Sequence, residues 1–94
     1  MSDIQVVHAE ADRRYEVIVD GKRAGTARYR RKGDAVVFFH TEVDDEYEGK
    51  GVGSALARGA LDDVRARGEH VIAECPFIKA YIERHPEYQD LLAA

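Results

Sequence analysis

The 94-residue sequence has little cysteine, little proline and no long apolar run. The single cysteine, Cys75, excludes an intrachain disulfide and a zinc site built from several thiolates. The longest apolar run, residues 35–39, is far shorter than the roughly 20 residues that a membrane-spanning helix needs. Asp3 and Glu10 stand where a signal peptide would have an apolar block. We therefore expect a protein of the reducing cytoplasm with no membrane partner.

Basic charge is not in excess either. Fourteen basic against 18 acidic residues leave a net charge of −4, which makes a general nucleic-acid-binding protein a poor fit. The run at residues 28–32 is rich in arginine and points to nucleic acid, but such charges also protect a sheet edge from aggregation. The acidic stretch at residues 42–48 lacks the spacing of a calcium loop, so we expect no metal site. The length predicts one domain, residues 1–94, with its core at about 15–92.

The first half of the chain has the pattern of an antiparallel meander. Residues 1–12 show little pattern, and we expect them to be weakly structured. Turn signals follow at Asp20-Gly21 and at residues 32–34. These turns separate three segments rich in strand-forming residues: 15–19, 23–30 and 35–43. Three strands joined by tight turns predict an antiparallel meander.

The third of these strands is apolar on both faces, which is typical of a central strand. Strict alternation would place His40 on the same face as Val36 and Phe38. It would place Thr41 and Val43 together on the opposite face.

The second half of the chain alternates helix and strand. Apolar residues recur at helical spacing from Val52, and Gly68 is a suitable C-terminal cap. Residues 70–74 form a short apolar segment typical of a buried strand. A second helix is predicted from Pro76 to about Arg84, with Pro86 ending it and a last helical turn over 87–92. The predicted order is βββαβα, a mixed α+β fold.

Three alternating glycines, Gly49, Gly51 and Gly53, lie between the third strand and the long helix. Such a loop lets an oxyanion approach main-chain amides at a helix N-terminus, where the helix dipole favours phosphate. The spacing does not match the dinucleotide motif G-x-G-x-x-G. Because Lys50 lies between the glycines, it does not match the triphosphate-binding loop either. The loop is therefore either a site for another pyrophosphate or a tight turn without a ligand.

These residues resemble the GCN5-related N-acetyltransferases, whose motif R/Q-x-x-G-x-G/A binds the pyrophosphate of acetyl-coenzyme A. Gly51 and Gly53 take the glycine positions, while Glu48 departs from the usual Gln or Arg. Residues 39–43, Cys75 and residues 85–88 make the sequence similar to a small, shortened branch, the YjdJ-like or NATD1-like domains. The resemblance covers about residues 15–92. It implies a truncated form of that fold and transfer of an acetyl group from acetyl-coenzyme A to an amine acceptor.

The resemblance also implies which residues hold coenzyme A. The sheet would open after the strand ending at Val43, and the pantetheine arm would lie there against the main chain of Thr41, Glu42 and Val43. Main-chain amides of the glycine loop would bind the pyrophosphate, namely those of Gly49, Lys50, Gly51, Val52, Gly53 and Ser54. Lys50 or Arg58 could meet the 3′-phosphate, although Lys50 could equally be a surface charge.

Three side chains are candidates for catalysis, which needs a neutral amine, donors for the carbonyl oxygen and a proton for the departing thiolate. Cys75 begins a helix, where the dipole favours a thiolate, and is a nucleophile, a lining residue of the acetyl pocket or simply buried. His40 is a base, a binding group or a satisfied core residue. By the resemblance, Tyr81 stands where relatives protonate the thiolate, or it packs its helix on the sheet.

Two further features bear on the partners. The acidic stretch 42–48, in which Glu42 could bind an amine, would attract a cationic acceptor such as a polyamine or a lysine side chain, unless its charges are only solvated. The resemblance to the shortened branch implies that the C-terminal strands that help to build the acceptor site of full-length relatives would be missing here. A non-catalytic module that binds coenzyme A or an acyl form of it is therefore the alternative to an enzyme. A nucleic-acid-binding accessory domain is a third reading, and we expect a monomer or a small homo-oligomer.

Overall fold

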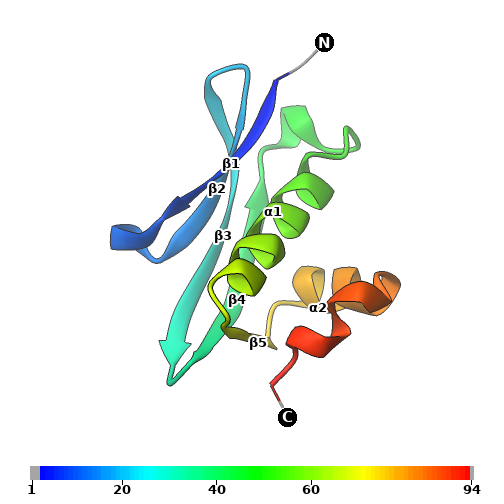
Figure 1. The fold of residues 1–94 in the computed structure, drawn as a ribbon. Coiled ribbons are helices and arrows are strands. Elements are labelled where there is room, and N and C mark those ends of the chain that lie inside the picture. Colours follow the sequence, from blue (N-terminus) through cyan, green and yellow to red (C-terminus); the bar gives the residue numbers. More distant parts are fainter. Residues whose placement is uncertain (1–2, 94) are drawn as a thin grey trace.

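The computed structural model describes residues 3–93, in which α1 lies across one face of a five-stranded sheet and α2 packs beside it (Figure 1). The strands follow one another across the sheet in sequence order, from β1 to β5. The first four pair antiparallel, and β4 pairs parallel with β5. The elements are β1 (Ile4–Ala9), β2 (Arg14–Val19), β3 (Lys22–Lys32), β4 (Ala35–Val43), α1 (Val52–Ala66), β5 (His70–Ala73) and α2 (Pro76–Arg84). The predicted mixed α+β fold is confirmed.

The N-terminal segment corrects the sequence prediction, because Ile4–Ala9 is an edge strand and not a weakly structured tail. It pairs with all six residues of β2, so the order is ββββαβα. Close packing on α1 holds it in place: a Cβ on Gly59 would lie only 2.6 Å from the Cβ of Val6. This contact between β1 and α1 joins segments that are far apart in the sequence. The pattern of residues 1–12 alone does not predict it.

A β-bulge in β4 changes which side chains face α1. The register pairs Arg28 with His40 and then Tyr29 with Phe38, so Phe39 has no counterpart on β3. A bulge of this kind places two successive residues on the same side of a strand. Phe39 and His40 are accordingly both exposed, whereas Phe38 is fully buried. The prediction that His40 shares a face with Val36 and Phe38 is therefore wrong.

The sheet opens at Phe38. Strand β5 pairs with β4 only as far as the partners Phe38 and Ala73. The carbonyl of Phe38 then accepts hydrogen bonds from the amides of both Glu74 (3.0 Å) and Cys75 (2.9 Å), and the chain leaves the sheet. Residues 39–43 of β4 thus have no strand partner on this side within the described part of the chain. The predicted opening beside the strand that ends at Val43 is therefore present, and it runs along residues 39–43.

The apolar stripe predicted for the long helix forms the centre of the core. Val52, Leu56, Ala60, Leu61 and Val64 are all buried, as part of one cluster that also includes residues of α2 and of the sheet. The helix ends before Gly68, whose φ of 71° is the left-handed conformation expected of a C-terminal cap. No helix within residues 3–93 has the length and apolar character needed to cross a membrane.

A polar cluster joins β1 to the end of α1. The ring of His8 stacks on Tyr15 with 4.2 Å between ring centroids, and its Nε2 lies 2.5 Å from the hydroxyl of Tyr29. The Tyr15 hydroxyl donates to Asp63 (2.7 Å), whose carboxylate lies 3.4 Å from Nδ1 of His8. Burial, assisted by the charge of Arg67, lowers the pKa of His8 below its ordinary value of 6.5. The folded protein therefore favours the neutral imidazole.

We expect this histidine to make folding pH-dependent. Its pKa in the unfolded chain exceeds that in the folded protein, so the unfolded state binds more protons as the pH falls below about 6.5. The free energy of unfolding should therefore decrease from about pH 7.5 to about pH 5.5, with the loss complete below the folded pKa. In His8→Asn, urea denaturation at both pH values should show a smaller difference than in the wild type. An equal difference would mean that His8 does not contribute.

Candidate functional site

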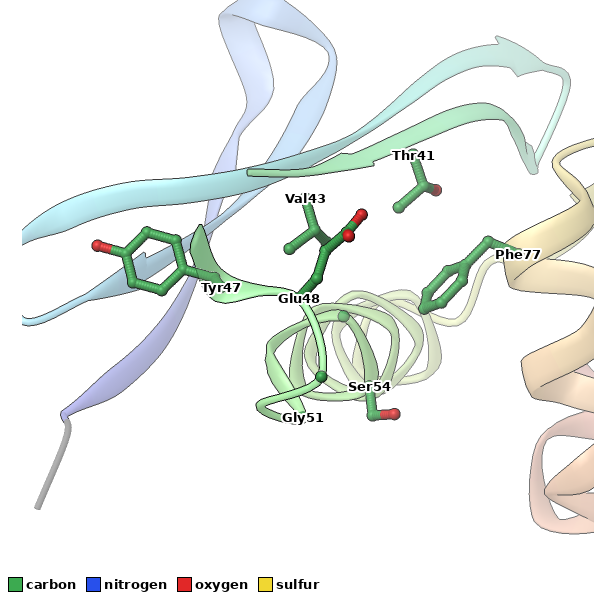
Figure 2. A pocket seen from close by; sticks show the side chains of 9 residues that line it. Thr41, Val43, Tyr47, Glu48, Gly51, Ser54 and Phe77 are labelled. Carbon is green, nitrogen blue, oxygen red and sulfur yellow. The ribbon is translucent and has the colours of Figure 1, made fainter. Parts of the chain in front are cut away.

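A cavity of about 400 Å³ lies where the open half of β4 faces the start of α1. Figure 2 shows Thr41 and Val43 of β4 facing the first turn of α1, with Phe77 pointing in from α2. The lining residues come from four parts of the chain: Thr41, Val43, Tyr47, Glu48, Gly49, Gly51, Gly53, Ser54 and Phe77. The structure thus brings together the end of β4 and the glycine loop, two segments that the sequence singled out for one ligand.

The glycine loop presents free amides to this cavity. Gly51 is the N-cap of α1 with a φ of 75°, and Gly49 has a φ of 77°, so both adopt the left-handed conformation that favours glycine. The helical bonding begins with the amide of Ala55 donating to the carbonyl of Gly51 (3.0 Å). No side chain caps the helix, and its first turn holds no acidic residue. The amides of Val52, Gly53 and Ser54 therefore have no protein partner among residues 3–93 and suit an oxyanion.

The open edge of β4 offers main-chain groups as well. The amide of Asp44 donates to the carbonyl of Ala24 (2.8 Å), so the main-chain amide of Asp44 faces β3. The carbonyl of Glu42 points the same way, because a Cβ on Gly25 would lie 2.5 Å from that oxygen. Main-chain groups alternate along a strand, so those of Thr41 and Val43 face the opening instead. These two residues are in position to bind an extended polar chain.

Cys75 lies at the inner end of the opening. It is buried at the N-cap of α2, and its Sγ lies 3.2 Å from Oγ1 of Thr41. The amide of Cys75 is tied to Phe38, the last residue of β4 that pairs with β5. The predicted position beside the opening is therefore found. A role as nucleophile, as pocket lining or in packing alone stays a prediction.

Three residues predicted to contact the cofactor have side chains elsewhere. Glu42 lies on the face of β4 opposite Thr41, and its main chain bonds toward β3, so we leave it out of the proposed cofactor site. Lys50 lines a separate depression that it shares with Asp20 and Tyr47. The side chain of Val52 is buried in the core, so only its amide is available at the loop.

The other two predicted catalytic side chains lie away from the cavity. His40 is half exposed on the same face of β4 as Glu42, and its Nε2 lies 3.0 Å from Oε1 of that residue. Tyr81 is buried in the core, where its ring stacks on His85 with 3.9 Å between centroids. Burial raises the pKa of Tyr81, which keeps its hydroxyl protonated at neutral pH. Neither residue lines the cavity, and both roles stay predictions.

The sequence reasoning missed two aromatic residues of the cavity, Tyr47 and Phe77. Phe77 is 40% exposed, and its Cζ lies 3.0 Å from where a Cβ on Gly53 would stand. The absence of that Cβ lets α1 and the ring of Phe77 approach each other at the cavity wall. No motif in the sequence indicated either residue, because Phe77 reaches the cavity through the long-range packing of α2 beside Gly53.

The charges around the site are unevenly paired. An acidic depression beside the cavity is lined by Thr41, Glu42, Val43, Asp44, Asp45, Glu46 and Glu48. In the basic run of β3, Arg30 forms a two-bond pair with Glu74 (2.9 and 3.0 Å) and Arg31 pairs with Glu69 (2.6 Å). Because these arginines are already paired with carboxylates, the hypothesis that the run binds nucleic acid is weakened.

Residues 3–93 contain no cluster of His, Cys, Asp and Glu suited to a metal ion.

The fold resembles solved acetyltransferase structures. A GCN5-like protein from Staphylococcus aureus, known from its NMR solution structure, superposes with a TM-score of 0.73 at 27% identity, over 100% of this chain and 92% of that chain. The ribosomal-protein-S18-alanine N-acetyltransferase from Escherichia coli superposes with a TM-score of 0.67, over 89% of this chain and 76% of that chain. Its identity of 19% makes this second likeness one of fold alone.

Sequence comparison gives the same result. Protein NATD1 from Gallus gallus is 33% identical over 85 residues, which cover 88% of this chain and 77% of that protein. Protein NATD1 from Homo sapiens is 32% identical over 85 residues, which cover 88% of this chain and 75% of that protein. These matches confirm the resemblance to the NATD1-like branch. The sequence model described as GCN5-related N-acetyl-transferase matches residues 14–91, and the chain therefore belongs to the GCN5-related N-acetyltransferase family.

Proposed function

We propose that the protein binds acetyl-coenzyme A in the cavity between β4 and α1 and transfers its acetyl group to an amine. The observation that carries this proposal is the meeting of two sets of free main-chain groups in one cavity. The amides at the start of α1 suit a pyrophosphate, and the open edge of β4 suits the amide-rich pantetheine arm. Membership of the family supports the same assignment.

The cavity residues suit the two parts of the ligand differently. Val52, Gly53 and Ser54 would bind the pyrophosphate through their main-chain amides at the start of α1. Thr41 and Val43 would hold the pantetheine arm, with Phe77 as its apolar wall. When bound, acetyl-coenzyme A would supply the thioester that carries the acetyl group. An arm running from the loop along β4 leads toward Cys75 and Thr41, where the sheet opens.

Isothermal titration of the full chain with acetyl-coenzyme A tests the binding step. We expect saturable binding at a ratio of one ligand per chain, with an affinity in the micromolar range typical of enzyme substrates, roughly 1 μM to 1 mM. The pyrophosphate-free fragment pantetheine should bind far more weakly. Absence of binding at millimolar acetyl-coenzyme A would contradict the proposed function.

A non-catalytic module that binds coenzyme A remains the second candidate. It is favoured by the position of Tyr81, which is buried away from the cavity and so does not stand ready to protonate a thiolate. The two candidates share the binding step and differ in turnover. Release of free coenzyme A thiol from acetyl-coenzyme A in the presence of a simple amine separates them. A protein that binds but releases no thiol above the uncatalysed rate would be the module.

A further inference from the structure

Strand β1 is the outer edge of the sheet and carries none of the features that usually protect such an edge (Figure 1). Natural edge strands are blunted by lysine, proline, a bulge or a covering segment. The six residues of β1, Ile-Gln-Val-Val-His-Ala, include no lysine, proline or carboxylate. Their register with β2 is continuous, whereas the β2–β3 and β3–β4 pairings each contain an irregularity. Among residues 3–93, no strand pairs with the outer side of β1.

The opposite edge of the sheet, by contrast, is protected. Strand β5 has only four residues. The C-terminal segment lies along its outer side, where the amide of Ala93 donates to the carbonyl of Val71 (2.9 Å) and Leu92 forms a parallel bridge with Val71. The open half of β4 is assigned above to the cofactor. Strand β1 is therefore the edge to which a further strand can be added.

The hydrogen bonds at the start of β1 show which of its main-chain groups are free. The carbonyl of Asp3 accepts a bond from the amide of Asp20 (2.9 Å), and the amide of Asp3 donates to the Asp20 side chain (2.8 Å). Main-chain groups alternate along a strand, so the odd-numbered residues of β1 bond to β2. The amides and carbonyls of the even-numbered residues face outward: Ile4, Val6 and His8.

The side chains of β1 suit an uncharged partner strand. Val6 packs against Gly59 on the α1 side, so alternation directs Val7 to the uncovered face, the face of the sheet that α1 does not cover. Ile4 is 39% exposed and Val7 is 44% exposed, which is unusual for large apolar residues in a strand of this chain. A strand added at this edge would cover both side chains and bond to the free main-chain groups beside them.

We propose that β1 pairs antiparallel with β1 of a second copy of this chain, so that two five-stranded sheets join into one. A two-fold axis beside Val6 gives the one antiparallel register that pairs all three outward residues, with Val6 opposite Val6 and Ile4 opposite His8. In this register Asp3 stands opposite Ala9, so no two like charges of residues 3–9 directly oppose each other. The segment is therefore complementary to itself.

The two-fold axis uses the open β1 edge of both copies, so the assembly closes at two. The cavity between β4 and α1 is separated from β1 by strands β2 and β3, and the pairing leaves it accessible. This inference is therefore independent of the proposed function, and its test needs no coenzyme A. A single pair of strands buries less surface than the roughly 1,200 Å² at which stable complexes begin, so we expect a weak dimer with a dissociation constant of about 10–100 μM.

Sedimentation equilibrium of the full chain measures the association. Between about 1 and about 500 μM protein, the mass should rise from 10.5 kDa toward twice that value. A mass of 10.5 kDa at every concentration would overturn the inference. A mass that continues to rise beyond two copies would also overturn it, because a closed two-fold pair offers no further edge.

Hydrogen–deuterium exchange locates the interface on β1. The amides of Ile4, Val6 and His8 are bonded only in the dimer, so their exchange should slow about fivefold between dilute and concentrated protein. The amides of Gln5 and Val7 bond to β2 in both states and should change little. Exchange that does not depend on concentration at the three outward amides would place the contact elsewhere and overturn the inference.

Val7→Lys should weaken the dimer about tenfold, because the two introduced lysines become diagonal neighbours across the axis and an apolar contact is lost. The fold tolerates this lysine, since Glu16 is the β2 partner of Val7. Adding Gln5→Glu should recover most of the affinity, because position 5 stands directly opposite position 7 of the second copy. Absence of this recovery would contradict the proposed register.

Phe39→Lys is the matched control. Phe39 is 43% exposed, close to the 44% of Val7, and it lies on β4, away from the β1 edge. This variant adds the same charge and removes an equally exposed apolar side chain, so it should keep the wild-type dissociation constant. An unchanged dissociation constant in Val7→Lys, or an equal increase in Phe39→Lys, would overturn the assignment of the interface to β1.

Discussion

Replacing Gly51 by valine should lower the affinity for coenzyme A about 100-fold, or nearly 3 kcal/mol of binding free energy. Gly51 is the N-cap of α1 with a φ of 75°, a conformation that a β-branched residue strongly resists. A change of this φ would turn the free amides of Val52, Gly53 and Ser54 away from one another. The new side chain would also stand in the open space beside the loop, where no atom now lies within 4 Å of a Cβ. Isothermal titration with coenzyme A measures the loss.

Gly68→Val separates this effect from general strain. Gly68 has a φ of 71° at the other end of α1, and a Cβ there would also meet no atom within 4 Å. Both variants should therefore lose a similar free energy of unfolding, about 1–3 kcal/mol for a residue forced into the left-handed region. Only Gly51→Val should lose affinity. Wild-type affinity in Gly51→Val would exclude the loop as the phosphate site, and an equal loss in Gly68→Val would assign the effect to folding.

The parts of the fold that depend on local sequence were predictable. The stripe from Val52 to Val64 recurs every three or four residues and is buried as expected. Gly68 ends α1, and Pro76 begins α2, because each residue has a backbone preference that acts without help from distant contacts. The cavity followed for the same reason, since the end of a central strand and the glycines after it are neighbours in the chain.

The parts that depend on distant contacts were not predictable. Strand β1 is held by pairing with β2 and by the contact of Val6 with Gly59. Its β-branched residues favour a strand, but the segment is short and only these distant contacts fix it at the edge of the sheet. The bulge at Phe39 arises from the register between β3 and β4, which no pattern within β4 reveals. That single extra residue moved His40 to the other face. Phe77 reaches the cavity only because α2 packs beside Gly53.

The bulge therefore determines which side chains β4 presents on each of its two faces. Without it, His40 would point toward α1, and Thr41 would point away from the cavity and from Cys75. With it, Thr41 and Val43 line the cavity while His40 and Glu42 face the other side of β4.

Phe38 and Phe39 test this arrangement directly, because they are adjacent, chemically identical and assigned to opposite environments. Phe38 is 0% exposed and packs near the rings of Tyr15 and Tyr29, whereas Phe39 is 43% exposed. Truncation of a buried phenylalanine costs about 3–5 kcal/mol, a large part of the roughly 5–15 kcal/mol that stabilises a small domain. Urea denaturation should show a loss of this size in Phe38→Ala. In Phe39→Ala, where little buried surface is removed, the loss should stay below about 1 kcal/mol.

The milder variant Phe38→Leu keeps the test usable if Phe38→Ala does not fold. It should lose about 1 kcal/mol, since leucine fills most of the space and a partly filled site costs less than an empty one. The Phe38 carbonyl also holds the amides of Glu74 and Cys75, so loosening this residue should weaken coenzyme A binding along with stability. Phe39→Ala should bind coenzyme A as the wild type does. Equal losses of stability in Phe38→Ala and Phe39→Ala would show that the bulge lies elsewhere, and the assignment of His40 to the uncovered face would fall with it.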